Sequence, residues 1–284
     1  MKYMIESSDT MEKGKLYICP TPIGNLEDIT IRTLKVLEEV DIIAAEDTRH
    51  SLKLLNHYEI KKPLTSYHEH NEREKSKELI QKLLEGKNIA QISDAGMPGI
   101  SDPGETLIAL AIERGIEVIA LPGATALITA LVASGLSTRR FTFEGFLPSK
   151  KKERVDRLRF LQEDSNTLII YESPHRIKDS LKDILTCFGN RRIAVIRELT
   201  KVYEEIFRSD IESAIEKFET DAPRGEFVLV VEGKTGEDIE KEIDIEKELL
   251  KYIEEGYTKK ASIKIVTEKY NLPKNEVYKK SLEI

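Results

Sequence analysis

The sequence predicts an α/β protein with two α/β domains and a small C-terminal helical unit. Short β-rich runs alternate with amphipathic helices in the first half of the chain, and strands outnumber helices beyond about residue 140. The charge pattern changes again near residue 236. Because alternation of strand and helix is typical of parallel strands joined by crossover helices, we expect an N-terminal α/β domain over 14–122, a mixed α/β domain over 123–235 and a helical unit over 236–284.

The first predicted domain alternates strictly between strand and helix. We expect strands at 15–19, 41–45, 87–92 and 117–121, and helices at 29–40, 70–85 and 104–114. Gly86 and Gly115 stand where the last two helices end. The uncharged stretch 118–138 is interpreted as a buried strand, a turn at Pro122 and a small-residue helix, because a membrane span needs about 20 strongly apolar residues.

Beyond about residue 140 the expected strands outnumber the expected helices, and the C-terminal part differs in charge. Further strands are expected at 141–144, 167–171, 193–197, 202–208 and 226–232. Residues 232–255 hold ten acidic and four basic side chains, whereas 259–280 hold seven basic and two acidic ones. Three helices are expected here, one around Ile245 to Ile253, then 259–270 and 274–282. This unit resembles a helix-turn-helix, and a solvated helical hairpin that packs on the core is the alternative.

Composition excludes several classes of protein. With 44 basic and 51 acidic side chains the net charge is −7, which excludes a globally basic nucleic-acid binder but allows a local basic patch. Cys19 and Cys187 are the two cysteines, too few for a disulfide framework. The first residues lack the apolar core of a secretory signal, so we expect a cytoplasmic protein.

The common nucleotide motifs are absent from the sequence. Fifteen glycines include no Gly-x-Gly pair, so the dinucleotide fingerprint is missing. Gly99 and Gly104 have P-loop spacing, but Glu105 replaces the lysine and would repel phosphate. His68 and His70 lack an obvious third ligand, so we expect no metal and interpret them as part of a surface junction.

Three stiff loops follow predicted parallel strands, where an open α/β sheet places its ligand crevice. They span 19–26, 92–104 and 121–126, and the second holds three glycines, two prolines and two aspartates. Ordinary turn chemistry would explain one such loop. Three loops at one edge of the sheet, one of them thirteen residues long, predict a ligand site.

These loops also carry a family resemblance. The motifs are Pro-Thr-Pro-Ile-Gly-Asn-Leu from residue 20, Ala-Glu-Asp-Thr-Arg at 45–49, Ser-Asp-Ala-Gly-Met-Pro-Gly-Ile-Ser-Asp-Pro-Gly from 93, Leu-Pro-Gly-Ala-Thr from 121, Tyr-Glu-Ser-Pro-His-Arg from 171, Arg-Glu-Leu-Thr-Lys from 197 and Gly-Glu-Phe from 225. Together they resemble the tetrapyrrole methylase superfamily, most closely its branch that methylates 16S ribosomal RNA. The resemblance covers about residues 14–233.

The resemblance implies two α/β domains with S-adenosylmethionine (SAM) in the cleft between them, a cytidine 2′-O-methyl product in the decoding region, and a homodimer. The implied cofactor contacts are Pro20, Pro22, Ser93, Asp94, Ala95, Met97, Pro98, Gly99, Ile100, Asp102, Gly123, Ala124, Thr125 and Tyr171. Asp94 and Asp102 would meet a ribose hydroxyl or an ammonium, or else cap turns. Tetrapyrrole-making members carry Gly-Asp-Pro where Ser93-Asp94-Ala95 stands, which argues against a tetrapyrrole substrate.

Transfer to a ribose hydroxyl needs alignment of the reacting atoms and benefits from a general base. The candidate bases within the shared motifs are Glu46, Asp47, Glu172 and Glu198. Each also has an interpretation as an ion-pair partner of a nearby arginine.

An RNA substrate needs cations, and 150–159 carries a net charge of +4. The candidate RNA contacts are Arg49, Arg139, Arg140, Lys150, Lys151, Lys152 and Arg154. The phenylalanines at 141, 143 and 146 either stack a base or belong to the core, and the basic C-terminal helices are a second RNA candidate. Two other functions remain open: a methyltransferase acting on a small molecule such as a tetrapyrrole, and a non-catalytic RNA-binding or assembly protein.

Overall fold

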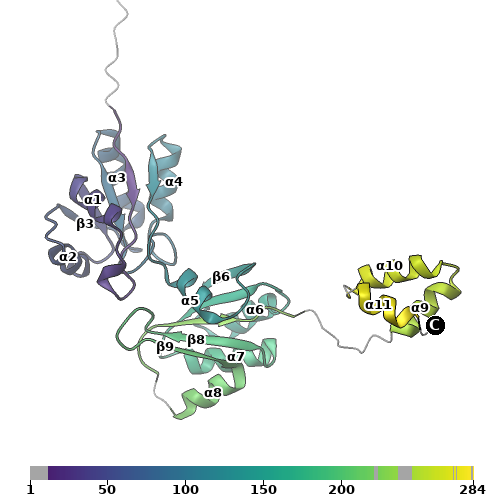
Figure 1. The fold of residues 1–284 in the computed structure, drawn as a ribbon. Helices are drawn as coiled ribbons and strands as arrows, with labels where there is room; N and C mark the ends of the chain where they lie inside the picture. Colours follow the sequence, from purple (N-terminus) through teal and green to yellow (C-terminus); the bar gives the residue numbers. More distant parts are fainter. Residues whose placement is uncertain (1–11, 221–222, 236–244, 271, 273, 283) are drawn as a thin grey trace, which may run out of the picture. The chain divides into compact units, whose positions relative to one another are not determined.

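The computed structural model describes residues 12–220, 223–235, 245–270, 272, 274–282 and 284. The chain divides into two compact units, 1–234 and 235–284 (Figure 1). In the described residues, the first unit contains two five-stranded sheets and the second contains three helices. Residues 1–11 and the stretch 236–244 lie outside the described residues.

The first sheet is entirely parallel. Its strands are, in spatial order, β3 (Leu64–Ser66), β2 (Ile42–Ala45), β4 (Ile89–Ile92), β1 (Leu16–Ile18) and β5 (Val118–Ala120). The helices between them are α1 (Ile31–Glu39), α2 (Thr48–His57), α3 (Glu72–Leu84) and α4 (Glu105–Glu113), with a short 3-10 turn at Leu26–Asp28. The parallel arrangement puts every loop that follows a strand at one edge of this sheet.

Apolar side chains alternate between the two faces of this sheet. Leu16 packs in a cluster with α3 and α4, whereas Ile43 packs in a cluster with α1 and α2. Helix α1 begins where Thr30 accepts a hydrogen bond from the amide of Thr33, and α2 begins where Asp47 accepts one from Arg49. Helices therefore cover both faces of the sheet. The loops at the carboxyl ends of its strands, called the rim below, are left uncovered by these helices.

The second sheet is mixed. Its strands are, in spatial order, β6 (Phe141–Phe146), β7 (Thr167–Glu172), β10 (Phe227–Val231), β8 (Arg192–Arg197) and β9 (Glu205–Asp210). Only β6 and β7 run parallel among these pairs. One face packs against α6 (Lys151–Leu161), α7 (Ile177–Phe188) and α8 (Ile211–Thr220), and the other against α5 (Ala126–Ser134).

The C-terminal unit consists of α9 (Ile245–Glu254), α10 (Lys259–Tyr270) and α11 (Lys274–Ser281). It has a small core of its own, formed by Ile245, Leu249, Ile263, Val266 and Val277. Thr258 precedes α10, and its hydroxyl accepts a hydrogen bond from the amide of Ala261 at 3.3 Å.

The predicted α/β class is confirmed, and most predicted elements lie within a few residues of their expected bounds. The strand predicted at 202–208 instead begins at Glu205, because Val202 and Tyr203 lie in an exposed turn. The sequence patterns did not single out α2, β3, α7 or α8. Among the described residues, no helix combines the length and apolar character needed to span a bilayer.

Candidate functional site

Two of the predicted rim loops are joined directly to each other. Thr21 and Gly96 form an isolated antiparallel bridge, and the Thr21 hydroxyl also donates a hydrogen bond to the carbonyl of Ser93 at 3.0 Å. Gly123, in the third loop, lies so close to Pro20 that an added Cβ would come within 2.6 Å of its ring. The three loops therefore form one packed rim.

A cavity of about 280 Å³ opens at this rim. Seven residues predicted from the sequence line it, namely Ala95, Met97, Ile100, Asp102, Thr125, Tyr171 and Glu172. The other predicted cofactor residues are not among its lining side chains: Pro20, Pro22, Ser93, Asp94, Pro98, Gly99, Gly123 and Ala124. These residues belong to the loops that shape the rim rather than to the cavity wall.

The second sheet supplies further wall residues beside the predicted Tyr171 and Glu172. Its contributions are Phe146, Ser173, Pro174, Ile196, Leu199, Glu226, Phe227 and Val228, and the rim adds Ile23, Gly96, Ser101 and Ala126. Several of these stand inside the motifs of the family resemblance. The family motifs therefore marked these residues, but hydrophobic patterns in one sequence do not show which strands of two separate sheets face the same cavity.

Aromatic rings form one side of the cavity. The ring of Tyr171 lies edge-on to those of Phe143 and Phe146, at centroid distances of 5.0 and 5.7 Å. Burial raises the pKa of Tyr171 to about 12, so its hydroxyl stays protonated at neutral pH. Phe143 packs with the core, whereas the Phe146 side chain is 54% exposed and is the ring placed to contact a ligand.

Asp102 is the charged group of the cavity wall that lacks a cationic partner among the described residues. Burial, together with the negative charges of Glu46 and Asp94, raises its pKa from 3.8 to about 7. A carboxylate in this environment is stabilised by a positively charged ligand or by a hydroxyl donor. The cavity thus combines apolar and aromatic walls with one carboxylate suited to a cation.

Two more acidic side chains lie beside Asp102 at the strand ends. The amide of Asp94 donates to the Glu46 carboxylate at 3.3 Å, and the amide of Asp47 donates to the Asp94 carboxylate at 3.2 Å. Burial, with the nearby charge of Asp94, raises the pKa of Glu46. This acidic corner attracts cations, and Glu46 has the raised pKa that suits a general base.

The other three base candidates are held by structural partners. Asp47 caps α2 and pairs with Arg49 at 2.9 Å, which lowers its pKa to about 2. Glu198 accepts hydrogen bonds from the amide of Glu226 and from Lys201, each at 2.9 Å. These contacts favour the ionised carboxylates and make them weaker bases.

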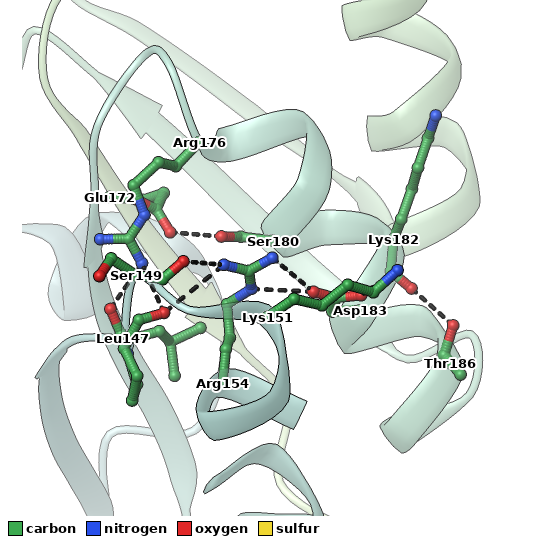
Figure 2. A network of polar contacts seen from close by, with 11 residues as sticks. Leu147, Ser149, Lys151, Arg154, Glu172, Arg176, Ser180, Lys182, Asp183 and Thr186 are labelled. Atoms are coloured by element: carbon green, nitrogen blue, oxygen red, sulfur yellow. Dashed lines mark hydrogen bonds and ion pairs between the residues drawn. The ribbon is translucent and has the colours of Figure 1, made fainter. Parts of the chain in front are cut away.

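Glu172 lines the cavity, but its carboxylate is turned into a buried network (Figure 2). It accepts hydrogen bonds from the Ser180 hydroxyl and from the amide of Ser173, and the Arg176 guanidinium lies 3.5 Å away. Arg176 in turn donates to the carbonyl of Leu147. An ion pair with an arginine therefore describes the geometry of Asp47 with Arg49 and of Glu172 with Arg176. Glu198 instead pairs with Lys201, and Arg197 pairs with Glu205.

Arg154 corrects part of the expected RNA surface. Only 5% of Arg154 is exposed, and its guanidinium contacts Asp183 at 2.7 and 2.8 Å and the carbonyl of Ser149 at 3.1 Å (Figure 2). The face of α6 that carries Arg154 packs against α7, so the guanidinium is neutralised inside the protein. Arg154 therefore presents no guanidinium to a phosphate.

The remaining predicted RNA contacts are exposed. Arg139, Arg140, Lys150, Lys151 and Lys152 lie on the surface at the start of β6 and of α6. Arg49 is 89% exposed while it pairs with Asp47. Arg157, on the same helix, is held by two hydrogen bonds to Glu144 at 2.6 and 2.7 Å. Residues 150–159 therefore present fewer free cations on the surface than their net charge of +4 indicates.

No group of three or more side chains suited to a metal ion occurs in the described part of the chain. The rings of His68 and His70 are 6.0 Å apart, edge to face.

Taken together, two β-sheets with flanking helices and a loop-rimmed cavity define an α/β protein of the kind that binds a small ligand at the ends of its strands. The family model described as Tetrapyrrole (Corrin/Porphyrin) Methylases matches residues 15–215. The chain belongs to this family of methyltransferases.

Two curated relatives are similar over nearly their whole length. The protein named Ribosomal RNA small subunit methyltransferase I from Halalkalibacterium halodurans is 49% identical over 273 residues, covering 94% of each chain. The protein of the same name from Haemophilus influenzae is 51% identical, covering 93% of this chain and 95% of its own. A solved structure of Uroporphyrin-III C-methyl transferase from Thermus thermophilus, complexed with S-adenyl homocysteine, has a TM-score of 0.55 and 16% identity. It covers 78% of this chain and 98% of its own, and it shows the shared fold.

Proposed function

We propose that this chain transfers a methyl group from SAM to the ribose 2′-hydroxyl of a cytidine in the decoding region of 16S ribosomal RNA. Membership of a methylase family makes SAM the methyl donor, and the names of the relatives point to RNA of the small ribosomal subunit. The observation that carries the proposal is the cavity with Asp102 in its wall.

The residues of this cavity fit SAM. The cofactor carries a positive sulfonium and an ammonium group, and Asp102 offers a carboxylate without a cationic partner among the described residues. The rings of Tyr171 and Phe146 add faces that attract a cation. Gly96, with φ of +81°, brings backbone close to the cavity where a side chain would reduce the space.

When bound, SAM supplies a methyl carbon attached to positively charged sulfur, which a nucleophilic oxygen can attack. The protein must hold that oxygen in line with the carbon and sulfur, which accounts for much of the rate acceleration. It must also accept the hydroxyl proton as the new oxygen–carbon bond forms. We assign this second role to Glu46, whose raised pKa distinguishes it from Asp47 and Glu198.

RNA contact is proposed for the exposed cations of the first unit. Arg139, Arg140 and the lysines 150–152 are exposed and can contact phosphate, with Lys150 also paired to Glu153 at 3.0 Å and Lys151 lying 4.0 Å from Asp183. Arg154 cannot contact phosphate, because its guanidinium is buried against Asp183. Because the whole chain has a net charge of −7, a few basic surfaces would select where RNA binds.

The proposal includes a cytoplasmic homodimer. Exposed apolar side chains support self-association: Val132 on α5 is 70% exposed and Val202 is 93% exposed. Light scattering of the full chain measures this directly, with twice the mass of one chain expected.

The function is tested with small ribosomal subunits from a strain that lacks this protein. The full chain and isotopically labelled SAM should place one methyl group on the ribose of one cytidine, located by mass spectrometry of RNA fragments. Label on a base, or on a tetrapyrrole offered as a competing acceptor, would reject the proposed substrate. Titration calorimetry that shows no heat with SAM would favour the non-catalytic alternative.

A further inference from the structure

The C-terminal unit contains an open groove of about 770 Å³ between α10 and α11. Its lining residues are Lys259, Lys260, Ile263, Lys264, Thr267, Lys274, Tyr278, Ser281 and Leu282. Of these nine described residues, four are lysines and none is acidic, and the lysines stand on both helices. The groove is therefore a concentrated positive surface with an apolar floor.

Some lysines of this unit form ion pairs with glutamates of α9, whereas several groove lysines do not. Lys269 and Lys280 form ion pairs with Glu248 and Glu246 of α9, at 3.4 and 2.9 Å, and so join the helices. In contrast, Lys259, Lys260 and Lys274 make no ion pair with any residue that the structure describes. Like charges gathered at one groove repel one another, and this repulsion is relieved by an anionic ligand.

The groove lysines are not needed to hold the unit together. Its helices are already packed through buried side chains such as Leu249, Val266 and Val277, whereas Lys260 and Lys274 are exposed. The Tyr278 ring is 55% exposed at the same groove. An aromatic ring among lysines is an arrangement suited to a nucleic acid, where a base stacks while phosphates meet cations.

The methylase family model ends at residue 215, so this unit lies beyond it. The relatives named as ribosomal RNA methyltransferases match 93% and 94% of this chain, a share too large to leave the unit out. The unit thus accompanies the catalytic fold in relatives whose names specify a macromolecular substrate.

We propose that the α10–α11 groove binds the phosphate backbone of the RNA substrate. This inference rests on the proposed function, because it takes the RNA to be the molecule that is methylated. Lysine is a flexible point charge, so the contact reads the RNA backbone and not its sequence. The groove therefore contributes affinity for RNA and leaves the chemical step in the first unit unchanged.

The test compares two full-length variants of equal charge. Lys260→Gln with Lys274→Gln removes one groove cation from each helix. The control, Lys251→Gln with Lys279→Gln, removes two exposed lysines of the same unit that do not line the groove. Thermal unfolding and SAM calorimetry should match wild type for both variants.

Binding is measured by fluorescence anisotropy of a labelled, protein-free fragment of 16S RNA over a range of salt concentrations. The groove variant should bind about tenfold more weakly, and its plot of log K against log salt should be less steep by about 1.4, since each single-strand phosphate contact contributes about 0.7. In the methylation assay its KM for RNA should rise by a similar factor with kcat unchanged. The control should behave as wild type.

The outcomes separate the two proposals. If wild type methylates RNA and the groove variant binds and methylates as well as the control, the groove inference is overturned and the proposed function stands. If wild type methylates no RNA but binds it through the groove, the proposed function fails alone. A groove variant that loses activity on assembled subunits only, with protein-free RNA bound normally, would show an acidic protein surface as the partner and overturn the RNA assignment.

Discussion

Thr21 and Gly96 exchange two backbone hydrogen bonds across the rim of the parallel sheet. The amide of Thr21 donates to the carbonyl of Gly96 at 2.9 Å, and the amide of Gly96 donates back at 3.0 Å. The two residues belong to loops that follow β1 and β4, which are hydrogen-bonded neighbours in the sheet. This bridge fixes the position of the Gly96 backbone at the cavity.

Substitution Gly96→Ala should weaken SAM binding more than its effect on stability explains. Gly96 has φ of +81°, where alanine costs about 1–2 kcal/mol. The added Cβ would also meet the Cγ2 of Ile23 at 3.3 Å, so a wall of the cavity must shift. We expect the SAM Kd, measured by calorimetry, to rise about tenfold or more, since a displaced wall loses several contacts.

Gly135→Ala provides the matched control. Gly135 ends α5 with φ of +77°, and its added Cβ would meet only the Arg208 side chain, at an ordinary distance of 3.8 Å. It should lose a similar free energy of unfolding and keep the SAM affinity of wild type. Equal SAM affinities for the two variants would show that the Thr21–Gly96 bridge does not position the cofactor.

Asp102→Asn should stabilise the fold at pH 8 while it weakens SAM binding. The folded-state pKa of Asp102 is about 7, above its ordinary value of 3.8, so ionisation opposes folding. Stability from the protonated carboxyl is therefore present in full below about pH 4 and is lost as pH rises to 7. Asparagine stays neutral, and we expect a gain of about 2 kcal/mol at pH 8, discounted for partial exposure.

Urea unfolding at pH 4, 5, 7 and 8 measures this difference. The gain of the variant over wild type should grow between pH 4 and 7 and then stay constant. A variant that is less stable than wild type at pH 8 would mean that the Asp102 carboxylate is held by favourable contacts in the free protein. A SAM Kd unchanged at pH 8 would remove Asp102 from the cofactor site.

Much of the fold could be predicted from local patterns. The run at 89–92 is apolar and short, and 72–84 has helical spacing, so β4 and α3 were predictable from periodicity alone. Helix α2 was harder to predict because it begins directly after β2 at Asp47, and β3 has three half-buried residues with no apolar alternation. Such short elements are formed by tertiary contacts, which one sequence does not display.

The rim loops of the site were easier to predict than the part of the wall formed by the second sheet. Asp102 and Met97 lie in a glycine- and proline-rich loop whose composition marks it as special. In contrast, Phe227 and Val228 look like any buried strand, because the antiparallel pairing that brings them to the cavity is long-range. Arg154 looked like part of a basic surface because charge counts do not show that Asp183, 29 residues further on, faces it.

Arg154→Met should destabilise the second domain strongly. Arg154 and Asp183 are both almost fully buried, and removal of the arginine leaves the buried carboxylate of Asp183 with only the exposed Lys151, 4.0 Å away, as a cationic partner. Breaking a buried pair in this way costs about 3–5 kcal/mol. Chemical unfolding should therefore show a much lower free energy of unfolding for this variant.

Lys152→Met serves as the comparison from the same helix. Lys152 is exposed, so its loss should change stability by about 0.5 kcal/mol or less. The double variant Arg154→Met with Asp183→Leu should recover most of the lost stability, because no charge is then left buried. A double variant as unstable as Arg154→Met would show that Arg154 acts through its bonds to the carbonyls of Pro148 and Ser149 instead.

Glu46→Gln should abolish most of the methyl transfer and leave SAM binding intact. Glu46 accepts a hydrogen bond from the amide of Asp94, which glutamine can also accept through its carbonyl oxygen, so the rim should keep its shape. A missing general base lowers kcat by about 10²- to 10⁴-fold. Asp47→Asn is the comparison, since asparagine caps a helix as well as aspartate does and Asp47 is too weak a base to contribute.

The wild-type kcat should rise with pH through the raised pKa of Glu46, and this rise should be missing from the residual activity of Glu46→Gln. Equal losses in both variants would instead assign a shared electrostatic role to the acidic corner, and full activity of Glu46→Gln would exclude it as the base.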